Sequence, residues 1–475
     1  YLYRIPGPLN DSMFEADPAM STRSRNYFSP DIYVPSVALD WKLTAHTKLN
    51  VTASGVFGNR SSVQFDAFAN VPDAIDPLTG TYKNRQVDID QFNSRTVEAR
   101  LLHEYSINRI KGKLATGVVY MNNDLHRRQL GKGTAGSDYD LTLVQPGFGR
   151  DIHFKSGNIA MFAENTFSFN ERLSISPGIR WENGSSEMNG VITYYPSNQL
   201  PATIDHQFVL AGISGQYTLN KDNTLYGGFS QAYRPVLFKD IVPASTYEQI
   251  GKDLKDATGY NAEIGVRGKL LRSLQYDISL FSLLYKNRMG TLVLQDNTGQ
   301  SYTYKTNVGN SRTSGLEMFV QYKLRLTNNL YAGIFTSTSY MKAEYISGQV
   351  SAGTENKSIA GNKVEAVPEW ISRNGLDVLY KGFACTLLYN YTSSSYSDAL
   401  NTVVPPASGA RGFTPSYSVW DFNASGRINA LFTVRAGVNN IFDKHYYTKR
   451  PTFYPGPGIW PSDGRNAYVT LGFKL

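Results

Sequence analysis

Cationic side chains gather where strand-like segments of this sequence meet its longer loops. Six of them lie beside the ends of predicted strands in the first third of the chain: Arg60, Arg95, His126, Arg127, Arg128 and Arg150. The planar guanidinium of arginine holds a carboxylate through two parallel hydrogen bonds, so a group of arginines suits an anionic chelate that carries carboxylates. Two simpler interpretations stay open: solvated loop charges, and contacts with anionic lipopolysaccharide.

Four aromatic residues near the predicted loops could stack on a planar ligand: Tyr233, Tyr396, Tyr454 and Trp460. An aromatic girdle at a membrane surface is the simpler explanation for each of them. Catalytic patterns are missing, because the sequence has no P-loop, no zinc-ligand spacing and no GxSxG, and its six histidines lie far apart. Residues 131–136 match the GxGxxG spacing, but they lie in a predicted loop with no helix after it. We therefore predict a binding protein without catalytic residues, metal site or cofactor.

Composition narrows the class of protein. Aromatic residues make up 13% of the chain, with 32 Tyr and 24 Phe, and no apolar run is long enough for a spanning helix. The net charge of +8 favours anionic partners, although lumen and loop charges that only keep the surface soluble would give the same balance. The single cysteine, Cys385, cannot form an internal disulfide, and we interpret it as a small apolar residue of a strand.

A period of two runs through most of the chain. In residues 173–182, Leu173, Ile175 and Ile179 alternate with polar residues such as Ser176 and Arg180. In a β-strand this period separates an apolar face from a polar face. Charges at every second position suit a wet lumen, whereas lipid accepts only the apolar face. A large soluble β-sandwich is the alternative, but it needs far less of this alternation.

The strands recur in hairpins whose short turns alternate strictly with long loops. The predicted strands cover residues 37–44, 49–58, 95–106, 113–123, 156–169, 172–183, 207–219, 225–234, 260–270, 275–288, 314–324, 331–344, 370–379, 383–393, 417–428, 432–443 and 465–475. Short turns on one side and long loops on the other are typical of outer-membrane barrels. The sequence thus predicts an all-β fold, an antiparallel transmembrane β-barrel with about seventeen strands in this chain.

The first residues read as the middle of a loop. The chain opens on residues 1–30, which are rich in Pro, and shows no signal peptide. An odd number of strands cannot place both termini on the periplasmic side of a bacterial barrel. We therefore expect that strands preceding residue 1 are missing from this sequence.

Several short stretches carry a resemblance to a known family. They cover residues 176–182, 226–235, 261–267, 281–288, 307–317, 438–443 and 463–468. In their order and spacing, the chain resembles the barrel of a TonB-dependent outer-membrane receptor, most closely the ferric citrate type. The last residue, Leu475, departs from the Phe that often ends such strands, although Phe473 lies nearby.

The resemblance implies a 22-stranded barrel with an N-terminal plug, so residues 1–475 would be one barrel domain that lacks the plug and about five strands. It also implies TonB-coupled import of a ferric chelate, with ferric citrate or a siderophore as cargo and the TonB–ExbB–ExbD complex as partner, in the outer membrane of a Gram-negative bacterium. Another cargo (a glycan, cobalamin or a peptide) and a passive porin-like barrel are the alternatives. No nucleic-acid partner is expected.

Overall fold

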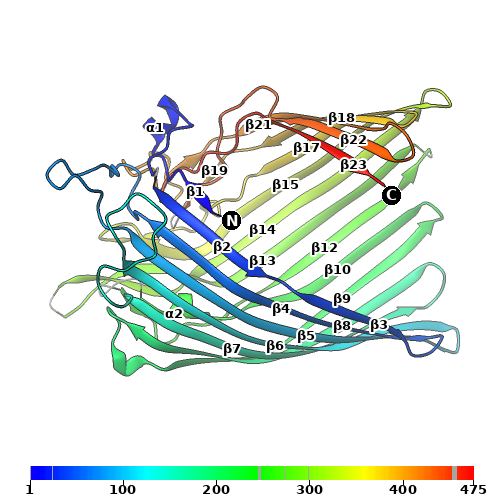
Figure 1. Cartoon of the computed structure of the whole chain (residues 1–475). Coiled ribbons are helices and arrows are strands. Elements are labelled where there is room, and N and C mark those ends of the chain that lie inside the picture. The colour runs from blue at the N-terminus through cyan, green and yellow to red at the C-terminus, as the bar shows by residue number, and fades with distance from the viewer. Residues whose placement is uncertain are drawn as a thin grey trace.

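The fold is described from a computed structural model that covers residues 2–23, 25–243, 248–271, 273–297, 299–451 and 457–474. Most of the chain is β-structure, and its long strands form one large curled sheet (Figure 1). The predicted turn near Arg272 and the terminal residue Leu475 lie outside the described residues. The all-β prediction is confirmed.

The long strands of the sheet are β2 (Asn26–Tyr33), β3 (Ser36–Lys42), β4 (Thr47–Gln64), β5 (Gln86–Ile107), β6 (Ile110–Lys132), β7 (Arg150–Ser168), β8 (Leu173–Ile192), β9 (Ala202–Asn220), β10 (Asn223–Arg234), β12 (Ala257–Leu270), β13 (Leu274–Gln295), β14 (Ser301–Arg325), β15 (Leu330–Ser351), β17 (Trp370–Tyr380), β18 (Phe383–Thr392), β21 (Tyr417–Arg427), β22 (Phe432–Asn439) and β23 (Asn466–Phe473).

The short elements are β1 (Tyr3–Ile5), β11 (Glu248–Ile250), β16 (Asn356–Ser358), β19 (Ser395–Tyr396), β20 (Phe413–Thr414), α1 (Asp11–Ala16), α2 (Phe238–Ile241) and a 3-10 turn at Ser197–Gln199. Both β2 and β3 pair with β4, so together they count as one interrupted strand. On this count the described wall has seventeen long strands, which agrees with the number predicted from the alternation.

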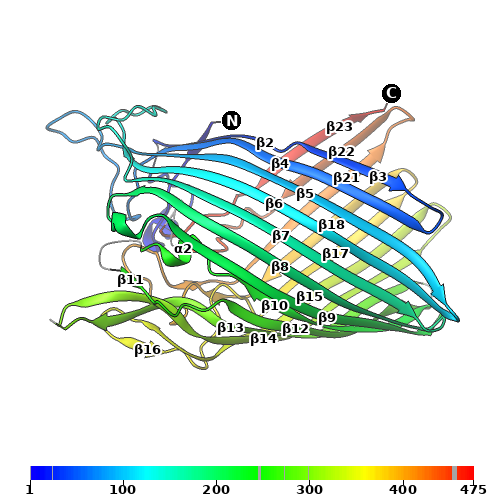
Figure 2. The ribbon, with the colours of Figure 1, turned by 90° about the horizontal axis from the view of Figure 1, so that it is seen from below.

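Neighbouring long strands pair antiparallel in chain order from β4 to β23. They slope across the wall, with the short turns at one end and the long loops at the other (Figures 1 and 2). Within the described residues no pairing joins β3 to β23, so these two strands are the edges of the sheet. Their side chains are correspondingly exposed, with Val37 at 72% and Val469 at 71%.

The two faces of the wall differ as the alternation predicted. Ile179 on β8 is 55% exposed on the outward face, together with Val209 and Ile213 of β9. The next residue, Arg180, points to the inward face, where its Nε pairs with Glu182 at 2.5 Å. A cavity of about 460 Å³ opens there along β7 to β12, and its lining includes the polar residues Glu164, Arg180, Ser214 and Glu263. The apolar residues of β8 therefore do not point into a sandwich core.

Buried apolar side chains are concentrated at the loop end. One cluster joins Ile152, Met188 and Ile192 of the wall to Phe238 of α2. A second joins Val63 and Val87 to loop residues between β6 and β7, and a third joins Ala343 and Tyr345 of β15 to Ile359 and Val364 of the following loop. The middle of the wall has a polar inward face and an exposed outward face, so packing against loops supplies the hydrophobic core of this fold.

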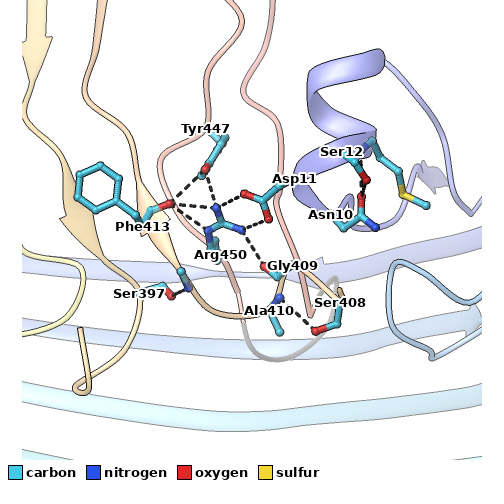
Figure 3. A network of polar contacts seen from close by, with 12 residues as sticks. Asn10, Asp11, Ser12, Ser397, Ser408, Gly409, Ala410, Phe413, Tyr447 and Arg450 are labelled. Carbon is cyan, nitrogen blue, oxygen red and sulfur yellow. Dashed lines mark hydrogen bonds and ion pairs between the residues drawn. The ribbon is translucent and has the colours of Figure 1, made fainter. Parts of the chain in front are cut away.

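The N-terminal segment ties the loop ends of the two sheet edges together. Leu9 exchanges two backbone hydrogen bonds with Ile459, with N–O distances of 2.9 and 2.7 Å. Arg450 is buried beside it and donates to Asp11 at 2.8 Å and to the carbonyl oxygens of Gly409 and Phe413, both at 3.0 Å (Figure 3). Because five hydrogen-bond donors of one guanidinium hold three segments, Arg450 fixes their relative positions.

Several strands extend further toward the loops than predicted. β6 was expected to end near residue 123, but it continues to Lys132, and β5 begins at Gln86 instead of residue 95. The added residues 124–129 of β6 are polar on both faces except for Leu125, so they carry no apolar alternation that would reveal a strand. In the added part of β5, Val87 and Ile89 do alternate with Asp88 and Asp90, but the run is short. The backbone groups of these added residues pair with one another instead, which places His126, Arg127 and Arg128 on a strand and not in a loop.

Candidate functional site

The loop-proximal parts of β4, β5 and β6 bring two of the predicted arginines together. Arg60 of β4 lies opposite Asp90 of β5, and Asp90 lies opposite Arg127 of β6. Directly opposed residues of antiparallel strands share a face, so all three side chains point to the same side of the sheet. This is the inward face, because Glu98 and Arg100 occupy positions of the same parity on β5.

Asp90 is the acceptor that the two arginines share. Its side chain is only 4% exposed, and it forms an ion pair with Arg60 and a second one with Arg127, whose Nε lies 3.0 Å from Oδ1. The Arg60 guanidinium also lies over the ring of Phe92, 5.5 Å from its centre. Two guanidinium groups around one carboxylate leave a net charge of +1. Both arginines remain about one-third exposed, which leaves N–H groups free to face an anion.

Arg150, at the start of β7, faces inward one step nearer the loops. Its Nε donates to the hydroxyl of Tyr194, and its guanidinium lies 5.1 Å from the centre of the Tyr194 ring. Ile152 separates Arg150 from Arg127 on this face. It lies opposite Arg127 and is buried in the apolar cluster with Phe238 of α2. Arg150 thus extends the cationic surface but does not share the carboxylate.

Two of the other three predicted residues, Arg95 and Arg128, have the opposite orientation. Arg95 lies opposite Asn122 on the face that also carries exposed Val97. Arg128 lies over the ring of Phe148, 5.8 Å from its centre, where the loop after β6 covers the outward face. Neither side chain reaches the inward cluster.

His126 also faces outward, where it forms a compact polar group with His153. The two rings stack with centres 4.0 Å apart and an angle of 11° between them. His126 Nε2 lies 2.7 Å from an Asp151 oxygen, and His153 Nδ1 lies 2.9 Å from an Asp124 oxygen. The six predicted residues therefore form two groups on opposite faces, and whether either group binds a ligand stays a prediction.

Two further inward clusters were not predicted from the sequence. Arg288 Nη2 lies 2.9 Å from Glu365, whose other oxygen accepts the Tyr345 hydroxyl at 2.6 Å. Arg234 of β10 pairs with Asp240 of α2 at 2.8 Å, and Asp240 is buried. The only sequence signal was an arginine at the loop end of a strand, because the partners come from other segments whose approach depends on loop folding.

The aromatic residues singled out in the sequence do not form one platform. The ring of Tyr233 stacks on Phe208, 3.8 Å between centres, and its hydroxyl donates to Asp256. Tyr396 packs edge-on against Phe413 at 5.5 Å. Tyr454 lies outside the described residues. A ligand-stacking role for these residues stays a prediction.

Among the described residues, no three His, Cys, Asp or Glu side chains are placed to hold a metal ion. No helix in the described part of the chain combines the length and the apolar content needed to cross a membrane. The inward clusters near the loops keep partly exposed guanidinium groups, and they are the candidate binding site.

Comparisons with known proteins agree on the family. The model of the TonB dependent receptor-like β-barrel matches residues 4–441. The probable TonB-dependent siderophore receptor PiuA of Acinetobacter baumannii is 23% identical over 309 residues, which are 62% of this chain and 38% of PiuA. The ferric enterobactin receptor PirA of Pseudomonas aeruginosa is 24% identical over 72% of this chain and 44% of PirA. The chain thus spans about two-fifths of the length of these relatives.

Solved structures show the same fold. The unliganded ferric citrate transporter FecA superposes with a TM-score of 0.78 and 21% identity, over 100% of this chain and 66% of FecA. The siderophore receptor PiuA superposes with a TM-score of 0.73 and 17% identity, over 99% of this chain and 70% of PiuA. These related proteins are receptors and transporters, not enzymes. The chain belongs to the TonB-dependent receptor-like β-barrel family.

Proposed function

We propose that this chain forms the wall of an outer-membrane receptor that imports a ferric chelate by TonB-coupled transport. The observation that carries the proposal is the inward pair of guanidinium groups around the buried carboxylate of Asp90. A site with net charge +1 and free N–H groups, at the loop end of a polar lumen, suits an anionic chelate. We propose that the chelate contacts Arg60, Arg127 and Arg150. The proposed site does not include the outward residues Arg95, His126 and Arg128.

Ferric citrate is the cargo that we test first. Citrate supplies several carboxylates, which pair with arginine in a bidentate manner. The similarity to FecA supports this cargo, whereas the siderophore receptor PiuA and the ferric enterobactin receptor PirA support a siderophore. A catecholate siderophore would depend more on aromatic stacking than on arginine forks, so the two cargoes predict different responses to loss of the arginines.

Energy coupling completes the proposal. A ligand held at the loop end needs a second event that releases it toward the turn end. By resemblance to the family, we propose that this event is the movement of a plug domain by TonB, which is driven by ExbB and ExbD. Collapse of the proton gradient should then stop uptake of the chelate while leaving its binding intact. Uptake that continues without the gradient would point to a passive pore.

The test compares two variants that each lose two positive charges. Arg60→Gln with Arg127→Gln removes the inward pair, and Arg95→Gln with Lys155→Gln removes two exposed charges from the outward face of β5 and β7. Ferric citrate binding is measured by titration of the purified receptor in neutral detergent. We expect the inward variant to bind at least about tenfold more weakly, because charge-assisted hydrogen bonds are lost, and the outward variant to change less than about twofold.

Two results would contradict the proposal. Equal binding by both variants and the unchanged receptor would remove the arginines from the site. Tight binding of a ferric catecholate, with no dependence on Arg60 and Arg127, would replace citrate by a siderophore as cargo. Far-UV circular dichroism and the heat-dependent shift in gel migration check that each variant is folded.

A further inference from the structure

Outward-facing cations are spread unevenly around the wall. Lys286 of β13, Arg312 of β14 and Lys342 of β15 share the outward face at the loop side of the apolar band. The register places Arg312 opposite Leu284, two residues before Lys286, and places Lys342 opposite Ser314, two residues after Arg312. Three neighbouring strands thus present three cations on adjoining positions of one face.

These cations are poorly neutralised by the protein. Lys342 pairs with Glu344 at 2.8 Å, and both side chains are exposed, at 61% and 38%. Among the described residues, neither Lys286 nor Arg312 forms an ion pair, and both are exposed. Three cations with one carboxylate leave a net charge of +2 on this patch.

The opposite part of the wall provides an internal comparison. At the same side of the apolar band, the outward faces of β5 to β8 carry Arg95 and Lys155, but also Asp124 and Glu187. Lys155 lies directly opposite both Asp124 and Glu187 in the register. Two basic and two acidic side chains balance there, so β13, β14 and β15 carry an excess of positive charge that this part of β5 to β8 does not.

The patch borders directly on aromatic and apolar side chains. Tyr340 is the outward residue of β15 next to Lys342. Its ring packs on the ring of Trp370, with centres 4.8 Å apart. Leu280, which is 55% exposed, follows on β13. Between the cations and this apolar surface, Ser282 and Ser314 join their hydroxyls at 3.0 Å. A molecule that fits this surface has an anionic headgroup attached to apolar chains.

We propose that Lys286, Arg312 and Lys342 form a docking surface for the phosphate groups of a phosphorylated lipid in the membrane leaflet nearest the long loops. The lysine and arginine side chains bind the phosphates, and the acyl chains lie along Tyr340, Trp370 and the apolar residues below them. This inference relies on the membrane placement of the proposed function, but not on its cargo.

The test uses diphosphoryl lipid A in mixed micelles and native mass spectrometry of the receptor to count retained lipid. Lys286→Gln with Arg312→Gln removes the two unpaired cations, and Arg95→Gln with Lys155→Gln is the matched control on the other part of the same face. We expect the first variant to retain lipid at least about tenfold more weakly, and the control to change less than about twofold. Both changes lie on exposed positions, so folding should be preserved.

Three outcomes would overturn the inference. An equal loss of lipid retention in both variants would show a general attraction between basic side chains and the lipid, with no specific site. Equal retention of a dephosphorylated lipid would show that only the acyl chains are bound. Displacement of the lipid by inorganic phosphate at the same concentration would show that the three cations bind free phosphate. Ferric citrate titrations on the same variants keep the two proposals separate, because loss of the lipid site should leave chelate binding unchanged.

Discussion

Arg127 and His126 are neighbours in the sequence but belong to two different environments. Arg127 points inward, where Asp90 holds it beside Arg60. His126 points outward and stacks on His153 between two aspartates. The inward group has a net positive charge and lies on the polar face of the wall, whereas in the outward group each histidine contacts a carboxylate of its own. The number of charges near a loop therefore does not define a binding site until each side chain is assigned to a face of the sheet.

The inward surface depends on the packing of the loop end, so the largest expected effect comes from breaking that packing. Arg450→Met leaves Asp11 and the carbonyl oxygens of Gly409 and Phe413 without their shared donor. We expect the free energy of unfolding to fall by about 3 kcal/mol, because a buried ion pair loses one partner. Hydrogen exchange of residues 9–23 should speed up in parallel.

A matched change refines this first prediction. Asp11→Asn together with Arg450→Met removes both charges, so part of the lost stability should return. Unchanged hydrogen exchange in Arg450→Met would show that the N-terminal segment is held by Leu9 and Ile459 alone.

A second prediction concerns the negative charge at the centre of the inward group. Asp90→Asn raises its net charge from +1 to +2 while keeping a side chain of the same shape. Ferric citrate should then bind several-fold more tightly, about three- to tenfold, because the anion no longer competes with a carboxylate for the guanidinium groups. Isothermal titration measures the affinity. Weaker binding would mean that Asp90 is needed to hold the two arginines in place.

The smallest effect is expected on the outward face. His126→Gln with His153→Gln removes the stacked pair but keeps polar side chains of similar reach. Ferric citrate affinity should stay within about twofold of the unchanged protein, because these residues lie on the far side of the sheet from Arg127. A tenfold loss would place the outward group in the binding site and remove the distinction between the two faces.

Much of the wall was predictable from alternation alone. The seventeen strands and the outward position of Ile179 follow from a period of two, since only one face of each strand is apolar. The orientation of Arg95 was also readable, because it has the same parity as Val97. Position near a strand end alone does not separate such outward cations from inward ones.

Other features depend on contacts that no local pattern reveals. The pairing of Arg60 and Arg127 through Asp90 requires the register of three strands, β4, β5 and β6. Arg450 and Asp11 are 439 residues apart. Long-range ion pairs of this kind are set by how loops pack, and loop packing leaves no periodic signal in the sequence.

The most direct test of the two-faced wall uses adjacent residues of β9. Ile213 is 51% exposed outward, and Ser214 lines the inward cavity. In a Cys385→Ala background, Ile213→Cys and Ser214→Cys each receive a nitroxide label, and the receptor is placed in lipid vesicles. We expect the label at 213 to be reached by oxygen dissolved in lipid, and the label at 214 by a water-soluble nickel complex. Equal accessibility of the two labels to both reagents would contradict a wall with one face toward lipid and the other toward water.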